Sequence, residues 1–226
     1  MALNNFSEHI LEQLFDSAVK VRLLKLFLRN EESIFTLSEV RRRTQLESGI
    51  LQRQLEKLRS AGFLKVRTQK TRKTEDKSSK EKKKSKKVQK KTKKIVGAKE
   101  KVFSLNPEFV FYNELRNLVL QSSPASKERM ARRIKNLGKI KLAVLSGIFT
   151  DAERANLRTD LLIVGDNISE RKLVNFIRAL EAEAGAELSY TTLATEEYMY
   201  RFKMFDKFLL NILENPHEKL INRLKA

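Results

Sequence analysis

The chain of 226 residues contains no cysteine and only two histidines, His9 and His217. Because cysteine is missing, disulfides, thiolate metal sites and thiol nucleophiles are all excluded. Two histidines so far apart in the sequence give no basis for a metal site or a catalytic triad, so we predict no metal and no cofactor. A chain without thiols fits a reducing compartment, and we expect the protein in the cytoplasm.

Phosphate-binding glycine loops and long apolar runs are missing as well. The seven glycines form neither a P-loop nor the paired-glycine loop of dinucleotide-binding proteins. No run approaches the roughly 18 apolar residues of a membrane helix, and the first residues lack the charged and apolar regions of a signal peptide. We therefore predict neither a membrane span nor a signal peptide.

Positive charge, in contrast, is abundant and concentrated in one segment. Lysine and arginine number 47 against 28 acidic residues, which gives a formal net charge of +19. Residues 65–101 alone hold 18 basic and four acidic side chains, so they carry most of this charge. From Arg67 to Lys94 the only apolar side chain is Val88. Such a segment cannot bury enough apolar surface to fold, and we expect it to be disordered.

This lysine block predicts a polyanionic partner. A polycation gains affinity for phosphate backbones by releasing condensed counterions, and this gain does not depend on the base sequence. The block therefore favours a nucleic-acid partner without supplying specificity. Three other interpretations remain open: a solvated linker that binds nothing, attraction to an anionic membrane surface, and a nuclear localisation signal.

Short runs typical of strands lie on both sides of the lysine block. Residues 62–66 precede it and residues 101–105 follow it, and both runs are rich in β-branched and aromatic side chains. The sequence therefore predicts a hairpin whose connection is a long polycation.

Helical patterns precede the hairpin. Apolar residues repeat with helical spacing over residues 5–15, and Ser17 can cap a second helix. A capping box formed by Thr36 and Glu39 predicts a short helix that ends near Arg43. A tight turn over residues 44–46 then leads into an amphipathic helix over residues 48–60, with Gly62 as its left-handed stop.

This order of short helix, turn, amphipathic helix, glycine and strand pair is that of a winged helix-turn-helix, in which the third helix enters the major groove. Gln52 and Arg53 can present forked donors to base edges or phosphates, and Ser48 suits a phosphate. A plain helical bundle with a polar face is the alternative. The residues predicted to contact DNA are Arg41, Arg42, Arg43, Ser48, Gly49, Gln52, Arg53, Arg59, Lys65, Arg67, Lys82, Lys83, Lys84, Lys86, Lys87 and Lys101.

Residues 17–105 resemble the winged-helix domain of bacterial and archaeal transcriptional regulators. The resemblance lies in SAVKVRLLKLFLRNEESIFTLSEVRRRTQLESGILQRQLEKLRSAGFLKV and in KVFSLNPEFVFYNELRNLV. Family members have a short wing, so here the lysine block is an insertion between the wing strands. In the family Asn106-Pro107 ends the wing, and the helix over residues 108–120 often packs on a second copy. The resemblance thus implies a homodimer through this helix or the C-terminal domain, although the same apolar face could instead pack within the monomer.

A change of pattern after Ser122-Ser123-Pro124 predicts a second, small α/β domain. We expect a helix over residues 126–137, strands over 140–145 and 161–164, a helix over 170–183 and a third strand over 186–193. Residues 196–213 and 216–224 are predicted to be helical. This alternation favours a mixed sheet flanked by helices.

Residues 140–224 resemble the small nucleotidyltransferase-like domains that often follow a winged helix. The resemblance lies in KLAVLSGIFTDAERANLRTDLLIVGDNIS and in GAELSYTTLATEEYMYRFKMFDKFLLNILENP. In catalytic members a Gly-Ser pair ends the first strand and cradles triphosphate, and an Asp-x-Asp pair on the next strand holds two Mg²⁺ ions. A later strand supplies a third carboxylate. Gly147 and Asp160 match this pattern, and Glu187 lies on the third predicted strand.

Two positions depart from the catalytic pattern: Ile148 stands at the serine and Arg158 at the first aspartate. A guanidinium removes a metal ligand and also repels the cation, since two unit charges about 4 Å apart interact by roughly 4 kcal/mol at an effective dielectric near 20. The resemblance therefore implies a vestigial nucleotide site and no enzymatic activity. That site comprises Gly147, Asp160 and Glu187. An alternative cation site could form from Asp151, Glu153 and Asp166.

Near the C-terminus an aromatic stripe follows helical spacing, which is more typical of a core or a subunit contact than of a base-stacking surface. Its members are Tyr198, Phe202, Met204, Phe205 and Phe208.

The sequence thus predicts an α+β protein of two domains. Residues 1–121 are expected to form a winged helix-turn-helix, with a disordered lysine-rich wing insertion at 67–98. Residues 122–226 are expected to form a mixed-sheet nucleotidyltransferase-like α/β domain. The expected function is that of a transcriptional regulator whose third helix contacts double-stranded DNA while the wing binds phosphates, and whose C-terminal domain serves dimerisation, partner binding or ligand sensing. Two alternatives remain: a nucleotidyltransferase that modifies RNA or protein with Mg²⁺ and a nucleoside triphosphate, and general coating of DNA or RNA through the lysines.

Overall fold

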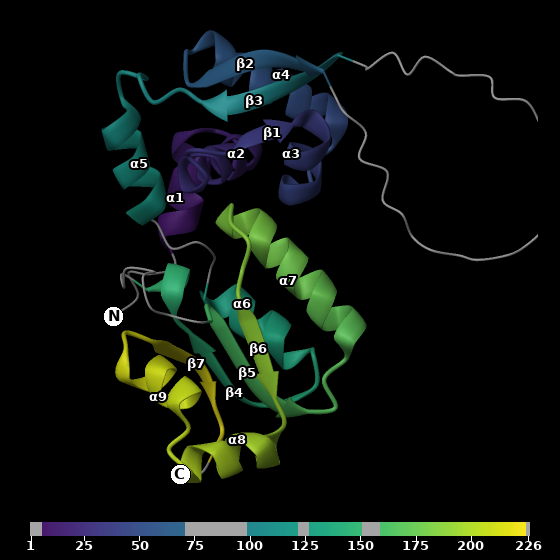
Figure 1. Cartoon of the computed structure of the whole chain (residues 1–226), viewed down its shortest axis with the longest axis vertical. Coiled ribbons are helices and arrows are strands. Elements are labelled where there is room, and N and C mark those ends of the chain that lie inside the picture. The colour runs from purple at the N-terminus through teal and green to yellow at the C-terminus, as the bar shows by residue number, and fades with distance from the viewer. Residues whose placement is uncertain (1–5, 71–98, 122–126, 151–158, 225–226) are drawn as a thin grey trace, which may run out of the picture.

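The computed structural model describes residues 6–70, 99–121, 127–150 and 159–224, and Figure 1 shows their arrangement. Within these residues the chain is a mixed α+β protein with two small sheets. The N-terminal half (residues 6–121) contains one sheet, and the C-terminal half (residues 127–224) contains the other.

The N-terminal half packs helices against a small antiparallel sheet. Its elements are α1 (Phe6–Leu14), α2 (Ala18–Arg29), β1 (Ile34–Thr36), α3 (Leu37–Thr44), α4 (Ser48–Ser60), β2 (Leu64–Lys70), β3 (Lys99–Leu105) and α5 (Tyr112–Gln121). The strand order is β1-β3-β2, and both pairings are antiparallel. Helix α2 lies at the centre of this half, because its residues from Leu23 to Leu28 are all buried.

Local capping explains where these helices begin. The Ser17 side chain accepts a hydrogen bond from the backbone N–H of Lys20 and caps α2. Thr36 and Glu39 form the reciprocal capping box that starts α3, which confirms the prediction from their spacing. Gly62 has a φ of +82°, a backbone conformation that favours glycine, and the chain turns there from α4 into β2.

The C-terminal half is a four-stranded sheet with helices on both faces. Its elements are α6 (Lys127–Lys135), β4 (Lys139–Leu145), the short 3-10 helix η1 (Gly147–Phe149), β5 (Leu161–Asp166), α7 (Glu170–Ala184), β6 (Tyr190–Leu193), α8 (Thr195–Lys203), α9 (Lys207–Glu214) and β7 (Glu218–Asn222). The strand order is β6-β5-β4-β7, and only the β5–β6 pairing is parallel.

Two apolar clusters cover the two faces of this second sheet. One cluster joins α6 and α7 to side chains such as Ala143 and Ile163, and the other joins α8 and α9 to Val144 and Leu162. Residues 161–165 of β5 are consequently buried on both sides. A fully buried strand of this kind needs the continuous apolar run that β5 has.

The structure corrects four predictions made from the sequence. Residues 216–224 are not a helix, because they contain β7, which pairs with the edge of β4. The helix predicted over residues 196–213 is two helices, and Phe205 between them has a φ of +52°. The third strand begins at Tyr190, so Glu187 precedes it. Helix α5 begins at Tyr112 rather than at residue 108, and the short strand β1 was not predicted.

The apolar face of α5 packs inside the same chain. Val119 is fully buried in the N-terminal core, and Leu115 and Tyr112 pack against that core. Helix α5 is held further by Glu31, whose carboxylate accepts a hydrogen bond from the Arg116 guanidinium at 2.8 Å. Much of the face that the sequence offered to a second copy thus packs within the same chain, whereas Leu118 on that face is 46% exposed.

The two halves touch through α2 and α3 on one side and α7 on the other (Figure 1). The Asn30 side-chain amide donates to the carbonyl of Gly185 at 2.8 Å. A Cβ added to Gly185 would lie 2.6 Å from the carbonyl carbon of Lys25, so only glycine allows this approach of the two backbones. In the described part of the chain, no helix has the length and apolarity needed to cross a membrane.

Candidate nucleic-acid interface

Helix α4 presents a polar face to solvent. Leu51, Leu55 and Leu58 are buried in the N-terminal core, while Gln52 and Arg53 are exposed. Helical spacing produces this division, because the three leucines recur at intervals of three and four residues. Two long polar side chains with several hydrogen-bond donors are thus held on a fixed scaffold.

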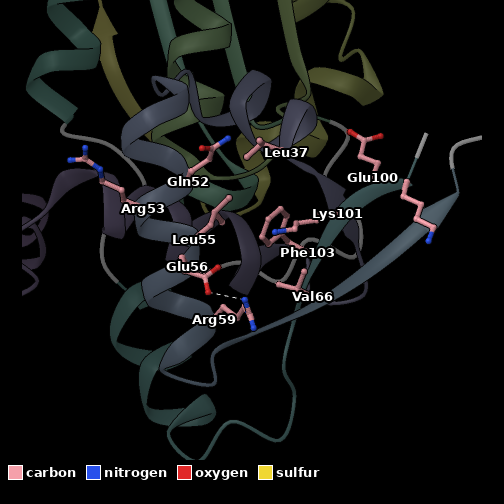
Figure 2. Close-up of a pocket in the computed structure, with 11 residues that line it drawn as sticks. Leu37, Gln52, Arg53, Leu55, Glu56, Arg59, Val66, Glu100, Lys101 and Phe103 are labelled. Atoms are coloured by element: carbon pink, nitrogen blue, oxygen red, sulfur yellow. Dashed lines mark hydrogen bonds and ion pairs between the residues drawn. The ribbon is translucent and has the colours of Figure 1, made fainter. Parts of the chain in front are cut away.

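A groove of about 830 Å³ lies between α4 and the β2–β3 hairpin, and Figure 2 shows its lining residues. Its apolar lining consists of Leu37, Leu55, Val66 and Phe103. Its charged lining consists of Arg53, Arg59, Lys99, Lys101, Glu56 and Glu100. The groove therefore carries charges of both signs, with cations in excess.

Within the groove, the Arg59 guanidinium donates to the Glu56 carboxylate at 2.7 Å. Both side chains are more than half exposed, so this pair contributes little to stability and can exchange partners at small cost. Arg59 was predicted to contact DNA and lies at the groove, but in the free protein its charge is already matched by Glu56.

The two faces of the β2–β3 hairpin differ. Side chains alternate along a strand, so Lys101 shares a face with Phe103 and lines the groove. Lys65 and Arg67 belong to the opposite face, since their neighbour Val66 pairs with Phe103. The Lys65 ammonium donates to Glu108 at 2.9 Å, and this hydrogen bond lowers the pKa of the Glu108 carboxyl. Of the described hairpin cations predicted to bind DNA, only Lys101 faces α4.

The three arginines of α3 have different surroundings. Arg43 donates to Glu187 of the C-terminal half at 2.8 Å, and its guanidinium lies 5.1 Å from the ring centre of Phe35. Its guanidinium therefore contacts the C-terminal half rather than extending from a free surface. Arg41 and Arg42 are exposed, and Arg42 lines a crevice of about 480 Å³ between α3 and α7.

The lysine-rich connection joins Lys70 to Lys99, which are opposite each other in the strand register. Residues 71–98 contain 13 basic and three acidic side chains. Five lysines that were predicted to contact DNA lie outside the described residues: Lys82, Lys83, Lys84, Lys86 and Lys87. The chain therefore leaves and re-enters the described structure at the tip of the hairpin that borders the groove.

The predicted vestigial site brings Gly147 and Asp160 together at the end of β4. Asp160 is 9% exposed, and its two carboxylate oxygens accept hydrogen bonds from the backbone N–H groups of Ile148 and Ser189, each at 3.0 Å. Gly147 has a φ of +56°, and a Cβ there would lie 2.1 Å from Asp160 Oδ1. Asp160 therefore ties η1 to the residues before β6, and only glycine fits beside it.

The other predicted carboxylates lie apart from Asp160. Glu187 turns to Arg43, and its side chain is 71% exposed. Asp166 is at the opposite end of β5, where it accepts hydrogen bonds from Thr195. Asp151, Glu153 and Arg158 lie outside the described residues. Among the side chains that the structure describes, no three acidic or histidine groups are arranged to hold a metal ion.

Several groove residues were not predicted from the sequence, chiefly Leu37, Lys99 and Phe103. The period-two alternation of a strand could have placed Lys99 and Phe103 on one face with Lys101. Leu37 belongs to α3, and only the packing of α3 beside α4 brings it to the groove. No protein-family model, no curated protein and no solved structure matches this chain.

Proposed function

We propose that this chain is a DNA-binding transcriptional regulator whose helix α4 lies in the major groove of double-stranded DNA. The observation that carries the proposal is the exposed polar face of α4 beside a groove with an excess of cations, with a lysine-rich connection at the tip of the adjoining hairpin. An α-helix fits the major groove of B-DNA, where arginine and glutamine side chains can bind two acceptors or donors on one base.

Helix α4 and the hairpin with its lysine-rich connection would contact different parts of DNA. Gln52 and Arg53 supply contacts to base edges, since both side chains are exposed on the rigid α4. Lys101 and the lysine-rich connection supply contacts to phosphates, which add affinity without sequence preference. Base contacts and phosphate contacts together are what a sequence-specific DNA-binding protein requires.

We propose further that the N-terminal half is a winged helix-turn-helix and that the β2–β3 hairpin is its wing. The order of α3, a left-handed turn at Gln45, α4 and the hairpin supports this assignment. The lysine-rich residues 71–98 are then an insertion in the wing, because they join its two strands.

For the C-terminal half we propose a nucleotidyltransferase-like domain without catalytic activity. The juxtaposition of Gly147 and Asp160 at a strand end supports the resemblance. The engagement of both Asp160 oxygens by backbone amides, together with Ile148 at the serine position, supports the loss of catalysis. Such a domain serves dimerisation, partner binding or ligand sensing.

The test is a selection of bound duplexes from a pool of random sequences, made with the intact chain and with the Arg53→Ala variant. We expect the intact chain to enrich a preferred sequence and the variant to lose preference at one or more base pairs, with a cost of roughly 1–3 kcal/mol at that position. Arg132→Ala, which removes an exposed arginine from α6, is the matched control and should enrich the same sequence as the intact chain.

The proposal fails if the intact chain enriches no sequence, or if Arg53→Ala and Gln52→Ala both enrich the sequence that the intact chain selects. In the first case any binding of DNA would be independent of sequence, as expected of the lysines alone. In the second case a surface other than α4 would provide specificity.

A further inference from the structure

A pocket of about 330 Å³ lies at the end of the C-terminal sheet where β4 begins. Four exposed cationic side chains line it: Lys135 from the end of α6, Lys139 and Lys141 from β4, and Arg223 from the residues after β7. The described residues that line this pocket include no acidic side chain.

Backbone contacts gather the cations of β4 and of the residues after β7. The register between β4 and β5 shifts between Ile140 and Leu142, and Lys141 lies at this irregularity. The backbone N–H of Arg223 donates to the carbonyl of Lys141 at 2.7 Å, which holds their main chains together. A Cβ added to Gly138 would lie 2.6 Å from the carbonyl oxygen of Asn167, so glycine permits the close approach of the chain beside the pocket.

The acidic group beside the pocket is Asp166, which lies opposite Lys139 in the strand register. Hydrogen bonds from the hydroxyl and the backbone N–H of Thr195 lower the pKa of Asp166, and Lys141 and Lys139 lower it further. Its oxygens are therefore already engaged by Thr195, and a single carboxylate does not neutralise four cations. A concave surface of this charge favours an anionic ligand.

We propose that this pocket is a second phosphate-binding site, which takes the phosphates of a second nucleic-acid segment or of a free polyphosphate. Where the ligand is a second nucleic-acid segment, the inference rests on the proposed function. Thr195 begins α8, so its bonds to Asp166 place the pocket beside the start of that helix. Helices α8 and α4 lie at opposite ends of the molecule (Figure 1), so a duplex held by α4 leaves this pocket open to a second ligand.

A bridging experiment tests the proposal with the full chain. One duplex that contains the preferred sequence is immobilised, protein is added, and capture of a second, labelled duplex is measured over a range of salt concentrations. The test variant combines Lys139→Gln, Lys141→Gln and Arg223→Gln. The control variant removes three exposed cations outside the pocket on the same half, through Arg171→Gln, Lys203→Gln and Lys207→Gln.

We expect the test variant to bind the immobilised duplex normally but to capture about tenfold less of the second duplex, with a salt slope smaller by about 3. The control variant should bridge like the intact chain. Normal binding of the first duplex also shows that the N-terminal half of the test variant is folded, and an unchanged circular dichroism spectrum shows the same for the C-terminal half.

Calorimetry with tripolyphosphate distinguishes the two phosphate sources. Binding of tripolyphosphate by the intact chain but not by the test variant, without any bridging, supports the site with a free polyphosphate as its ligand. The proposal is overturned if the test variant bridges and binds tripolyphosphate like the intact chain, or if the intact chain does neither. If the intact chain does not bind the first duplex either, the proposed function fails separately.

Discussion

Polar groups occupy two regions that the sequence marks as candidate sites. One is the exposed face of α4, and the other is the Gly147–Asp160 contact in the C-terminal half. They differ in what those groups already bind. Gln52 and Arg53 are exposed on α4, whereas both oxygens of Asp160 are bonded to backbone amides in a buried setting. A polar group whose partners come from the same chain stabilises the fold, and an exposed one is available to a ligand.

Glycine shows the same contrast between the two regions. A Cβ added to Gly49 on α4 would meet no atom within 4 Å, whereas one added to Gly147 would collide with Asp160. Position 49 on α4 therefore accepts a side chain without a clash. The end of β4 does not tolerate such a change, because Gly147 and Asp160 pack directly against each other.

The largest effect is expected from Asp160→Ala. The substitution leaves two buried N–H groups without an acceptor, and we expect a loss of roughly 4 kcal/mol in the free energy of unfolding. Urea denaturation followed by circular dichroism would measure it. Asp160→Asn, which keeps one acceptor oxygen, should lose about half as much. If Mg²⁺ raised the melting temperature of the intact chain but not of Asp160→Asn, Asp160 would instead be a metal ligand.

Gly147→Ala should destabilise the chain somewhat less, by roughly 3 kcal/mol. Its Cβ would lie 2.1 Å from Asp160 Oδ1, and alanine disfavours the φ of +56°. Gly49→Ala is the matched control and should stabilise α4 by up to about 1 kcal/mol. Thermal unfolding of both variants measures the contrast, and equal melting temperatures would remove the distinction drawn between the two regions.

Exchange of the 13 lysines and arginines within residues 71–98 for glutamine should weaken DNA binding roughly 100-fold at low salt and flatten the salt slope. The preferred sequence should stay the same, because the α4 face is intact. Fluorescence anisotropy with the selected duplex and a scrambled one measures both quantities. Loss of preference along with affinity would assign specificity to the lysine-rich segment.

A smaller effect is expected within the hairpin. Lys101 faces the groove, so Lys101→Gln should reduce the salt slope of DNA binding by about 1. Lys65 lies on the other face and pairs with Glu108, so Lys65→Gln should change the slope much less. Binding isotherms at several salt concentrations compare the two. Equal reductions would show that both faces of the hairpin meet DNA.

The smallest effect is expected at the contact between the halves. Glu187→Gln weakens the ion pair with Arg43, and because the Glu187 side chain is 71% exposed, we expect a loss of less than about 1 kcal/mol. Chemical denaturation measures this loss. A larger loss would show that the two halves depend on this ion pair for their stability.

Much of the helical structure was predictable from local patterns. The Ser17 cap, the Thr36–Glu39 box and the bounds of α4 follow from spacing and hydrogen-bonding groups within a few residues. The final segment was not predictable in this way. Residues 216–224 contain β7 because the edge of β4 offers backbone hydrogen-bond partners, and those partners lie more than 70 residues earlier in the chain.

The C-terminal aromatic stripe is divided by the end of a helix. Its spacing favoured a core or a subunit contact, and Tyr198 is indeed buried. Met204 and Phe205, however, are 64% and 75% exposed, because the helix ends there and the backbone turns at Phe205. A helical pattern predicts a common face only while the helix continues.

By itself the sequence determined the excess of positive charge, its concentration between two strands and the apolar and polar faces of α4, because these depend on composition and on spacing along one element. Only the tertiary structure decided which polar groups stay available to a ligand. It bonded Asp160 to two backbone amides, paired Arg43 with Glu187 and brought Leu37, Phe103 and Lys101 to one groove. Each of these arrangements joins different elements of the chain, and spacing within one element cannot specify it.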